Sequence, residues 1–255
     1  MTERLDRELV RRGLARSRSH AQAMINAGQI LVNGATVRRA GEQVAASAVI
    51  DAPKDRYVSR GARKLNGALD DLELSVTGRA LDAGASTGGF TQVLLARGCQ
   101  EVFAVDVGSN QLAPALRADP RVRVREGTNL RDLGLDDVGG LPVDLVVADV
   151  SFISLRLLVA PLLSVTRDDG WLLLLVKPQF EVGREHLGKG GVVREPADQL
   201  RAISGVINAA GEYGWHGMAA VPSHLPGASG NREFFVLLRR TQSVADLDLT
   251  AIVNT

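Results

Sequence analysis

LDAGASTGGF, residues 81–90, follows a short apolar segment typical of a buried strand and precedes a segment typical of a helix. Its glycines allow the backbone to approach a ligand closely, and the first amides of the helix are free to bind it. An acidic residue, Asp106, ends the next predicted strand, 22 residues after Gly84. A carboxylate at that place can accept hydrogen bonds from the two hydroxyls of a ribose. The stretch therefore predicts a strand–loop–helix unit that binds a nucleoside-containing ligand, and the alternative is a purely structural turn.

Strand and helix patterns continue to alternate on the carboxyl side of this loop. Apolar strands that alternate with helices are typical of a mostly parallel sheet with helices on both faces. We expect seven strands, at residues 80–82, 102–106, 122–126, 143–149, 171–177, 215–221 and 233–239. We expect helices at residues 89–97, 110–117, 155–166 and 196–213. The sequence therefore predicts an α/β domain with a doubly wound sheet.

The first 58 residues have a different pattern and are predicted to form a separate domain. Two short helices, at residues 6–13 and 20–27, precede a pair of strands at 30–37. Asn33-Gly34 lies between the two strands and is a strong signal for a tight hairpin. Pro53 then breaks the pattern and marks a linker. We therefore expect a small α+β domain with its linker at residues 1–58, followed by the larger domain at 59–255.

The net charge of +1 conceals an uneven distribution of charge. Residues 1–64 contain 13 Lys/Arg and 6 Asp/Glu, whereas residues 65–255 contain 17 Lys/Arg and 23 Asp/Glu. Six of the arginines lie between residues 4 and 18. Such a cluster favours a polyanionic partner, and the alternative is a charged surface that is only solvated.

Several classes of protein and site are not expected. The first twenty residues are rich in arginine and lack the apolar run of a signal peptide. Apolar runs such as residues 171–176 are far shorter than the ~20 residues that cross a bilayer. Cys99 is the single cysteine and the four histidines lack metal-ligand spacing, so we expect neither a disulfide nor a metal site. Together these features indicate a soluble cytoplasmic protein.

The acid that precedes the glycine loop distinguishes between two classes of cofactor site. Asp82 before Gly-x-x-x-Gly resembles the first motif of class I methyltransferases, which have a Rossmann-like fold and bind S-adenosylmethionine. Ser86 stands where a dinucleotide fingerprint has its second glycine, so a nicotinamide site is the less favoured alternative. The expected cofactor contacts are Asp82, Gly84, Ala85, Ser86, Thr87, Gly88, Gly89, Phe90, Asp106, Asn129 and Asp149.

Four further motifs carry a lysine or an acid at a place suited to catalysis. They are SRGARKL (59–65), DLVVADVSF (144–152), LLLLVKPQFEVG (172–183) and GASGNREFF (227–235). Asp149 and Lys177 end buried strands, and open α/β sheets bind their ligands at the carboxyl ends of strands. The order Lys64, Asp149, Lys177, Glu233 resembles the catalytic tetrad of the ribose methyltransferases related to FtsJ.

This resemblance implies methyl transfer to a ribose 2′-hydroxyl, and each of the four groups has a chemical reason to be present. The hydroxyl is a poor nucleophile, so a group that accepts its proton accelerates the reaction. We assign that role to Lys177, with Asp149 orienting its amine, and we expect Lys64 and Glu233 to position the ribose. The methyl group is attacked in line, so alignment supplies much of the rate and no metal is required.

LVRRGLARSRSHAQAMINAGQILVNG, residues 9–34, resembles the small RNA-binding module named after ribosomal protein S-four. The resemblance covers nearly all of residues 3–52. In that family the basic helix pair and the turn after it lie against RNA. The resemblance therefore implies RNA contacts from Arg4, Arg11, Arg12, Arg16, Arg18 and Arg38, and we add Arg60 of the following segment.

The chain as a whole resembles the TlyA family of bacterial proteins, in stretches that include ELVRRGLARS (8–17), VSRGARKL (58–65) and LVKPQFEVG (175–183). That resemblance implies 2′-O-methylation of cytidine in ribosomal RNA, with RNA of the large subunit and, in some members, of the small subunit as substrate. It also implies a link with susceptibility to capreomycin-type antibiotics.

Three other functions remain open from the sequence. Members of that family often carry the name haemolysin, so a membrane-acting cytolysin is one alternative, although no amphipathic membrane segment is visible. A pseudouridine synthase often carries the same N-terminal module but has no use for the glycine loop. A methyltransferase for small molecules would use the loop but would not explain the basic N-terminal segment.

Overall fold

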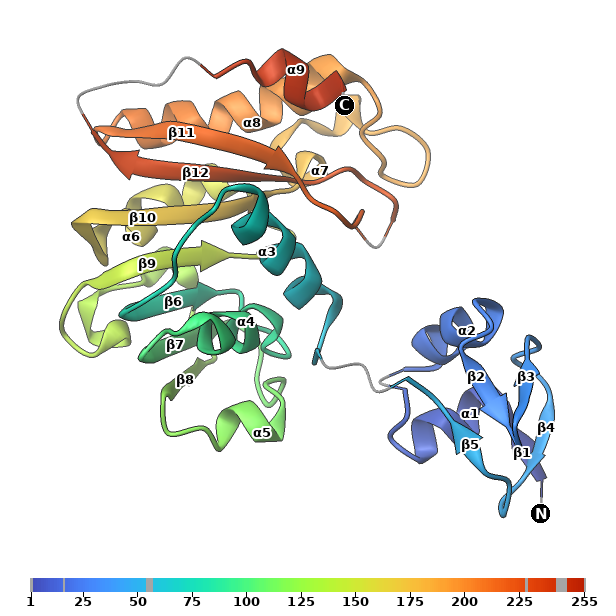
Figure 1. Cartoon of the computed structure of the whole chain (residues 1–255). Helices are drawn as coiled ribbons and strands as arrows, with labels where there is room; N and C mark the ends of the chain where they lie inside the picture. Colours follow the sequence, from blue (N-terminus) through green and yellow to red (C-terminus); the bar gives the residue numbers. More distant parts are fainter. Residues whose placement is uncertain (1, 16, 54–56, 228, 242–246, 255) are drawn as a thin grey trace. The chain divides into compact units, whose positions relative to one another are not determined.

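The computed structural model describes residues 2–15, 17–53, 57–227, 229–241 and 247–254. The chain divides into two compact units, Met1–Arg56 and Tyr57–Thr255, and each has an apolar core of its own (Figure 1). The boundary expected from the sequence, after residue 58, lies two residues further along the chain. Residues 54–56 of the linker and Arg16 lie outside the described residues.

The smaller unit packs two helices, α1 (Leu5–Arg11) and α2 (Arg18–Asn26), with short antiparallel strands. The strands are β1 (Thr2–Arg4), β2 (Ile30–Val32), β3 (Ala35–Val37), β4 (Gln43–Ala45) and β5 (Ile50–Asp51). They pair as β1–β4 and as β3–β2–β5. Asn33 and Gly34 have φ values of 50° and 82°, which the tight turn between β2 and β3 requires. The expected helices and hairpin are therefore present, whereas β1 and β4 are too short to show a sequence pattern.

The larger unit is built on a seven-stranded sheet. Its strands are β6 (Arg79–Ala83), β7 (Glu101–Asp106), β8 (Val122–Glu126), β9 (Val143–Ala148), β10 (Thr166–Val176), β11 (Trp215–Pro222) and β12 (Phe234–Arg240). Their order across the sheet is β11–β12–β10–β9–β6–β7–β8 (Figure 1). The strands from β10 to β8 run parallel, and β12 runs antiparallel to both of its neighbours. The mostly parallel α/β sheet expected from the sequence is confirmed.

Helices cover both faces of this sheet, and successive side chains of the central strands are buried on opposite faces. Leu174 of β10 packs in one core with α8 (Pro196–Gly211). Leu175 packs in the other core with α3 (Arg60–Asp71) and α4 (Gly89–Arg97). Burial on both faces explains the unbroken apolar run of β10 in the sequence. The other helices are α5 (Pro114–Arg117), α6 (Val159–Ser164), α7 (Pro178–Glu181) and α9 (Leu249–Asn254).

Three segments of the larger unit differ from the sequence-based expectations. Helix α3 was not expected, because its apolar positions lie between charged residues next to the linker. The helix expected at residues 110–117 is reduced to α5, because the Glu126 carboxylate accepts hydrogen bonds from the amides of residues 110–112. The helix expected at 155–166 is divided into a 3-10 turn and α6, and β10 already begins at Thr166.

Candidate functional site

Two cavities adjoin at the carboxyl ends of the parallel strands. The first, here called the loop cavity, has a volume of about 520 Å³, and the second, the lysine cavity, about 480 Å³. Asp149, Ser151 and Phe152, which follow strand β9, line both of them. A molecule in one cavity therefore lies next to a molecule in the other, and these three residues mark the place where the two would meet.

The glycine loop between β6 and α4 forms one wall of the loop cavity. Gly84 has a φ of 83°, and a Cβ atom there would lie 2.7 Å from the backbone oxygen of Asp149. A side chain at this position would therefore push the loop away from the end of β9. The Asp106 carboxylate accepts hydrogen bonds from the backbone amides of Ser86 at 2.8 Å and of Gly108 at 2.7 Å. Each carboxylate oxygen can accept a further bond, so Asp106 can hold the loop and a ligand together.

Asp82 lies beneath the loop and not in the cavity. Its side chain is fully buried, and Oδ2 accepts from the amide of Thr91 at 2.7 Å and from its hydroxyl at 2.6 Å. Among the described atoms, Asp82 Oδ1 has no hydrogen-bond partner. Burial raises the pKa of Asp82 to about 7, because the charged carboxylate loses its water. The structure thus gives Asp82 a position that fixes the start of α4, where a direct contact with a cofactor had been expected.

The structure separates the expected cofactor residues into two groups. Gly84, Ser86, Asp106, Asn129 and Asp149 line the loop cavity. The other expected residues line neither cavity, and these are Asp82, Ala85, Thr87, Gly88, Gly89 and Phe90.

Packing within the larger unit explains why several loop residues do not reach the cavity. The ring of Phe90 packs 6.0 Å from that of Phe235 between their centroids. A Cβ on Gly89 would lie 2.0 Å from Ser59 Oγ, so this glycine allows the start of α3 to approach α4. Phe90 and Gly89 therefore serve the packing of the loop, and the contacts expected from Ala85, Thr87 and Gly88 stay predictions.

Several residues of the loop cavity were not expected from the sequence. They are Val107, Gln111, Leu130, Val150, Ser151, Phe152, Ile153 and Leu158. Val107 follows the last residue of β7, and Val150 lies two residues after the end of β9. Because ligands bind at such strand ends, the sequence could have indicated both residues as candidates for the cavity. The backbone amide of Gln111 donates to the Glu126 carboxylate, and this contact holds Gln111 at the cavity. The sequence does not indicate this contact.

The four residues of the expected tetrad line the lysine cavity as two ion pairs. The Lys177 Nζ atom lies 2.7 Å from Asp149 Oδ1 and donates to Ser151 Oγ at 2.8 Å. The Lys64 Nζ atom lies 2.5 Å from Glu233 Oε2, and this pair is nearly buried. All four side chains line one cavity, although they are up to 169 residues apart in the sequence.

Strand register explains how these residues meet. Val176 at the end of β10 pairs with Phe234 at the start of β12. Lys177 follows the first of these residues and Glu233 precedes the second, so the two are brought to the same edge of the sheet. Lys64 comes from α3, whose buried face contains Leu65 and Ala68.

Phe152 is the residue at this site with the most unusual conformation. Its φ is 65°, which is strained for a residue with a large side chain, and 92% of its surface is exposed. Its ring lies 5.3 Å from that of Phe180 between centroids. An exposed aromatic ring in a strained conformation, between two cavities, indicates a contact surface for a ligand.

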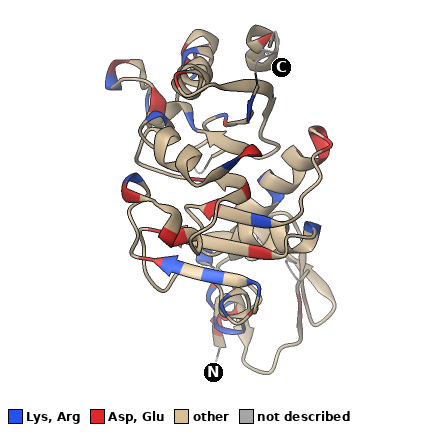
Figure 2. Cartoon of the chain, turned by 90° about the vertical axis from the view of Figure 1, so that its left-hand side faces the viewer, with Lys and Arg blue, Asp and Glu red and all other residues tan. Residues whose placement is uncertain are grey.

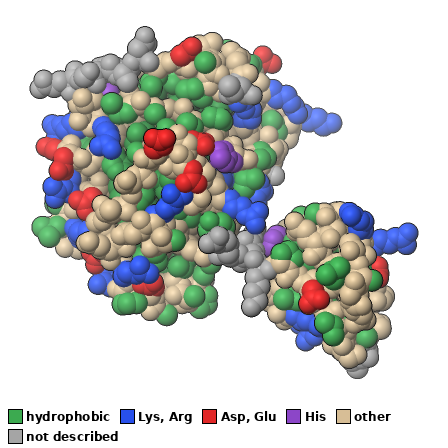
Figure 3. Space-filling model, viewed as in Figure 1, with side chains coloured by type: hydrophobic (Ala, Val, Ile, Leu, Met, Phe, Trp, Pro, Cys, Tyr) green, Lys and Arg blue, Asp and Glu red, His purple; other side chains and the backbone are tan. Residues whose placement is uncertain are grey.

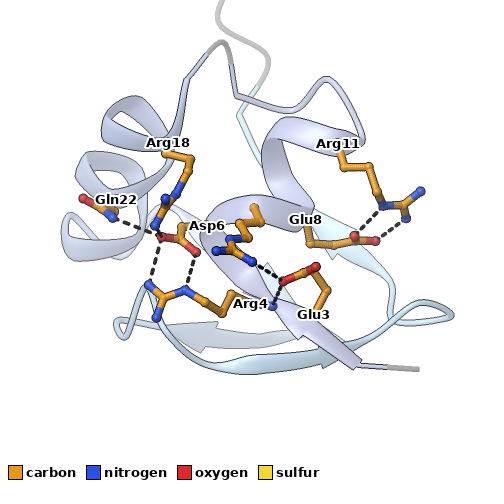
Figure 4. A network of polar contacts seen from close by, with 8 residues as sticks. Glu3, Arg4, Asp6, Glu8, Arg11, Arg18 and Gln22 are labelled. Atoms are coloured by element: carbon orange, nitrogen blue, oxygen red, sulfur yellow. Dashed lines mark hydrogen bonds and ion pairs between the residues drawn. The ribbon is translucent and has the colours of Figure 1, made fainter.

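Five arginines of the smaller unit have acidic partners within that unit, and the contacts of several are drawn in Figure 4; they are Arg4, Arg7, Arg11, Arg12 and Arg18. Asp6 is bound by Arg4 and Arg18 at 3.0 and 3.3 Å, and the Arg4 guanidinium holds the pKa of this carboxyl far below its usual range. Glu8 is bound by Arg11 and Arg12, which lower its pKa to about 2. The arginine cluster is therefore partly neutralised and held in a fixed arrangement.

These arginines differ in how much of the guanidinium remains available. The Arg11 and Arg18 side chains are 63% and 54% exposed. Arg12 is 23% exposed and also donates to the backbone oxygens of Ala46 and Ala48, so it serves mainly to hold the 45–48 turn. Arg38 donates to Asn26 O at 3.4 Å.

Arg60 belongs to the larger unit. It lines the lysine cavity and donates to the backbone oxygen of Pro226 at 2.8 Å. If Arg60 contacts RNA, as the sequence predicts, it would do so at the lysine cavity and not as part of the arginine cluster of the smaller unit.

Basic and acidic residues are mixed over most of the larger unit on the faces drawn. Figure 2 shows both kinds along it, with several basic positions in a row on one strand, and Figure 3 shows apolar, basic and acidic side chains mixed on another face. The acidic balance of residues 65–255 is therefore distributed and does not form a single acidic surface in these views.

Comparison with known proteins gives a family match for each of the two units. Residues 57–240 match the model of the FtsJ-like methyltransferase family, and residues 3–50 match that of the S4 domain. The chain is 50% identical over 240 residues to the 16S/23S rRNA (cytidine-2′-O)-methyltransferase TlyA of Mycobacterium tuberculosis, covering 92% of this chain and 89% of that protein.

Two further relatives carry the name hemolysin. Hemolysin A of Brachyspira hyodysenteriae is 35% identical over 233 residues, covering 91% of this chain and 97% of that protein. A solved structure of such a protein from Streptococcus thermophilus matches with a TM-score of 0.80 and 38% identity, covering 99% of this chain and 94% of that one. With this coverage of both units, the chain belongs to the TlyA family of FtsJ-like methyltransferases.

Proposed function

We propose that this protein transfers a methyl group from S-adenosylmethionine to the 2′-hydroxyl of a cytidine in ribosomal RNA. The observation that carries the proposal is the junction of the two cavities at Asp149, where the carboxylate holds the Lys177 amine. A cofactor site and a proton-accepting group are adjacent there, as methyl transfer to a hydroxyl requires. Cytidine and ribosomal RNA are the substrates named for the relative from Mycobacterium tuberculosis.

The residues of the loop cavity fit S-adenosylmethionine. Its volume of about 520 Å³ is ordinary for a small-molecule site, for which about 300–1,000 Å³ is typical. Asp106 can accept from the ribose hydroxyls, while Val107 and Leu158 offer apolar surface to the adenine. Asp106 and Asp149 place negative charge at a site for a cationic ligand. When bound, the cofactor would supply an electrophilic methyl group.

The residues of the lysine cavity would prepare the ribose for attack on that methyl group. Lys177 accepts the hydroxyl proton in its unprotonated form, and its bonds to Asp149 and Ser151 fix where its nitrogen points. The Lys64–Glu233 pair forms part of the wall against which the ribose rests. Holding the hydroxyl in line with the methyl group supplies a large part of the rate. The translational and rotational entropy of the reactants is then lost on binding and does not add to the barrier of the reaction.

Phe152 would hold the base of the target nucleotide. An enzyme that modifies a nucleotide within folded RNA must unstack it, and aromatic side chains replace the lost stacking. The exposed ring of Phe152 lines the same cavity as Lys177, so a base stacked on the ring would bring its ribose into that cavity.

The substrate is tested by following labelled methyl groups from S-adenosylmethionine. We expect label in ribosomal RNA when the protein is incubated with ribosomal subunits from cells that lack the enzyme, and we expect 2′-O-methylcytidine after digestion to nucleosides. Label confined to small molecules would instead favour the small-molecule alternative. Separate reactions with each subunit and with naked RNA identify the substrate form, which in the cell would be met in the cytoplasm.

A membrane-acting cytolysin is tested with protein-free liposomes. In the part of the chain that the structure describes, no helix is both long and apolar enough to cross a membrane. We expect no release of a trapped dye at protein concentrations that give full methylation. Dye release by a protein preparation that methylates no RNA at any concentration tested would replace the proposed function.

Replacing Asp106 tests the cofactor site. Asp106→Ala removes charge-assisted hydrogen bonds, each worth ~1.5–3 kcal/mol, so we expect S-adenosylmethionine to bind roughly tenfold to a hundredfold more weakly. Isothermal titration calorimetry measures this, with Asp136→Ala as the control, because Asp136 is an exposed carboxylate that lines neither cavity. Unchanged affinity in a folded Asp106 variant would remove this residue from the site.

A further inference from the structure

Glu181 is a buried acid next to the lysine cavity that the proposed reaction does not use. It is the last residue of α7, the short helix that begins directly after Lys177. Only 2% of its side chain is exposed. Its two carboxylate oxygens accept from Ser154 Oγ at 2.6 Å and from the amide of Leu155 at 2.7 Å. Glu181 therefore connects the segment after β10 with the segment after β9.

The segment that Glu181 holds is the one that carries Phe152. Residues 151–155 are bonded at two places to the segment that follows β10. Lys177 donates to Ser151, and Glu181 accepts from Ser154 and Leu155. Phe152 lies between these two attachments, with a φ of 65°. A non-glycine residue keeps such a conformation only when its surroundings enforce it, at a cost of about 1–3 kcal/mol.

Two further contacts tie the same segments together. The ring of Phe180, the neighbour of Glu181, lies 5.3 Å from the ring of Phe152. Arg156 lies 3.5 Å from the Glu181 carboxylate and donates to its backbone oxygen at 3.0 Å. Burial raises the pKa of Glu181, while the bonds from Ser154, Leu155 and Arg156 favour its ionised form.

We propose that Glu181 is a positioning residue that holds Phe152 over the junction of the two cavities and so determines how firmly the target nucleotide is bound. The proposal rests on the proposed function, in which the lysine cavity receives a ribonucleotide. Glu181 lines neither cavity, and its carboxylate bonds reach the site through the 151–155 segment. Its loss should therefore affect the RNA substrate and leave S-adenosylmethionine binding nearly unchanged.

Glu181→Gln keeps the size of the side chain and removes its charge, so it weakens the bonds to Ser154 and Leu155. Because base–aromatic stacking is worth ~1–3 kcal/mol, we expect kcat/KM for RNA to fall about tenfold, mainly through KM. Affinity for S-adenosylmethionine should change less than about threefold. Glu185→Gln is the control, because Glu185 is an exposed acid in the 3-10 turn that follows and lines neither cavity.

A double-mutant cycle with Phe152→Ala distinguishes positioning from a general structural role. If Glu181 acts through Phe152, the double variant should lose no more kcat/KM than Phe152→Ala alone, because the group that Glu181 positions is already absent. Losses that multiply would overturn the proposal. Should Glu181→Gln fail to fold, Ser154→Ala removes one of the same bonds and is expected to give a smaller loss with the same dependence on Phe152.

Hydrogen–deuterium exchange tests the holding role without any RNA. Amides of residues 150–155 should exchange faster in Glu181→Gln than in the wild type, while those of β7 should be unchanged. Unchanged exchange at residues 150–155 would contradict the proposal even if the protein methylates RNA. Conversely, the wild type could methylate no RNA while the amides of residues 150–155 still exchange faster in Glu181→Gln. That result would refute the proposed function and confine Glu181 to holding the segment.

Discussion

Lys177→Ala is expected to lower the rate of methyl transfer by ~10²–10⁴-fold, the range in which general acid–base groups contribute. The Lys177 Nζ atom is held by Asp149 and Ser151 at the junction of the two cavities, so its removal takes away the amine that these two residues orient. Single-turnover assays with saturating RNA and cofactor measure the chemical step. Affinity for S-adenosylmethionine should remain within a few-fold, because Asp106 and the glycine loop hold the cofactor.

Lys177→Arg separates the two roles that a lysine could have here. A guanidinium keeps the positive charge but does not lose its proton in proteins, so it cannot accept one from the hydroxyl. We expect this variant to be nearly as inactive as Lys177→Ala. Near-normal methylation by Lys177→Arg across the pH range would mean that Lys177 supplies only charge, and the general-base assignment would be wrong.

Deletion of residues 1–56 is expected to abolish methylation of ribosomal subunits and to leave S-adenosylmethionine binding largely intact. The larger unit has two apolar cores and contains both cavities, so the cofactor site does not depend on the smaller unit. Labelling of subunits and calorimetry with the cofactor measure the two effects. Full methylation of subunits by the truncated protein would show that the smaller unit is dispensable.

The full chain allows a second measurement of the smaller unit. Phosphate contacts should make RNA affinity fall with salt, with a log–log slope of magnitude ~0.7–0.9 per contact. Arg11→Ala and Arg18→Ala, which remove exposed guanidinium groups, should each reduce that slope. Arg12→Ala should act mainly on stability, because Arg12 holds the 45–48 turn. An unchanged slope in both exposed variants would place the RNA contacts elsewhere.

The strands and motifs of this protein could be predicted from the sequence because they depend on local patterns. Apolar runs buried on both faces identify the parallel strands, and a glycine loop followed by Asp106 identifies the ligand-binding end of the sheet. Asp149 and Lys177 could be assigned to one site for the same reason, since both follow buried strands. The S4-like hairpin was found from Asn33-Gly34, whose positive φ values have a direct sequence signal.

Contacts made between distant segments were decided only in the tertiary structure. The sequence does not show that Arg12 is bound by Glu8 and two backbone oxygens, or that Asp82 lies beneath the loop and not in the cavity. Nor does it show that Glu181 holds the segment of Phe152, because this requires α7 to pack beside the end of β9. Periodicity determines which face of an element is buried, whereas partners across elements depend on how the strands and helices pack. The order of elements and the residue types at the candidate site were thus determined by the sequence, and the tertiary structure decided which side chains meet.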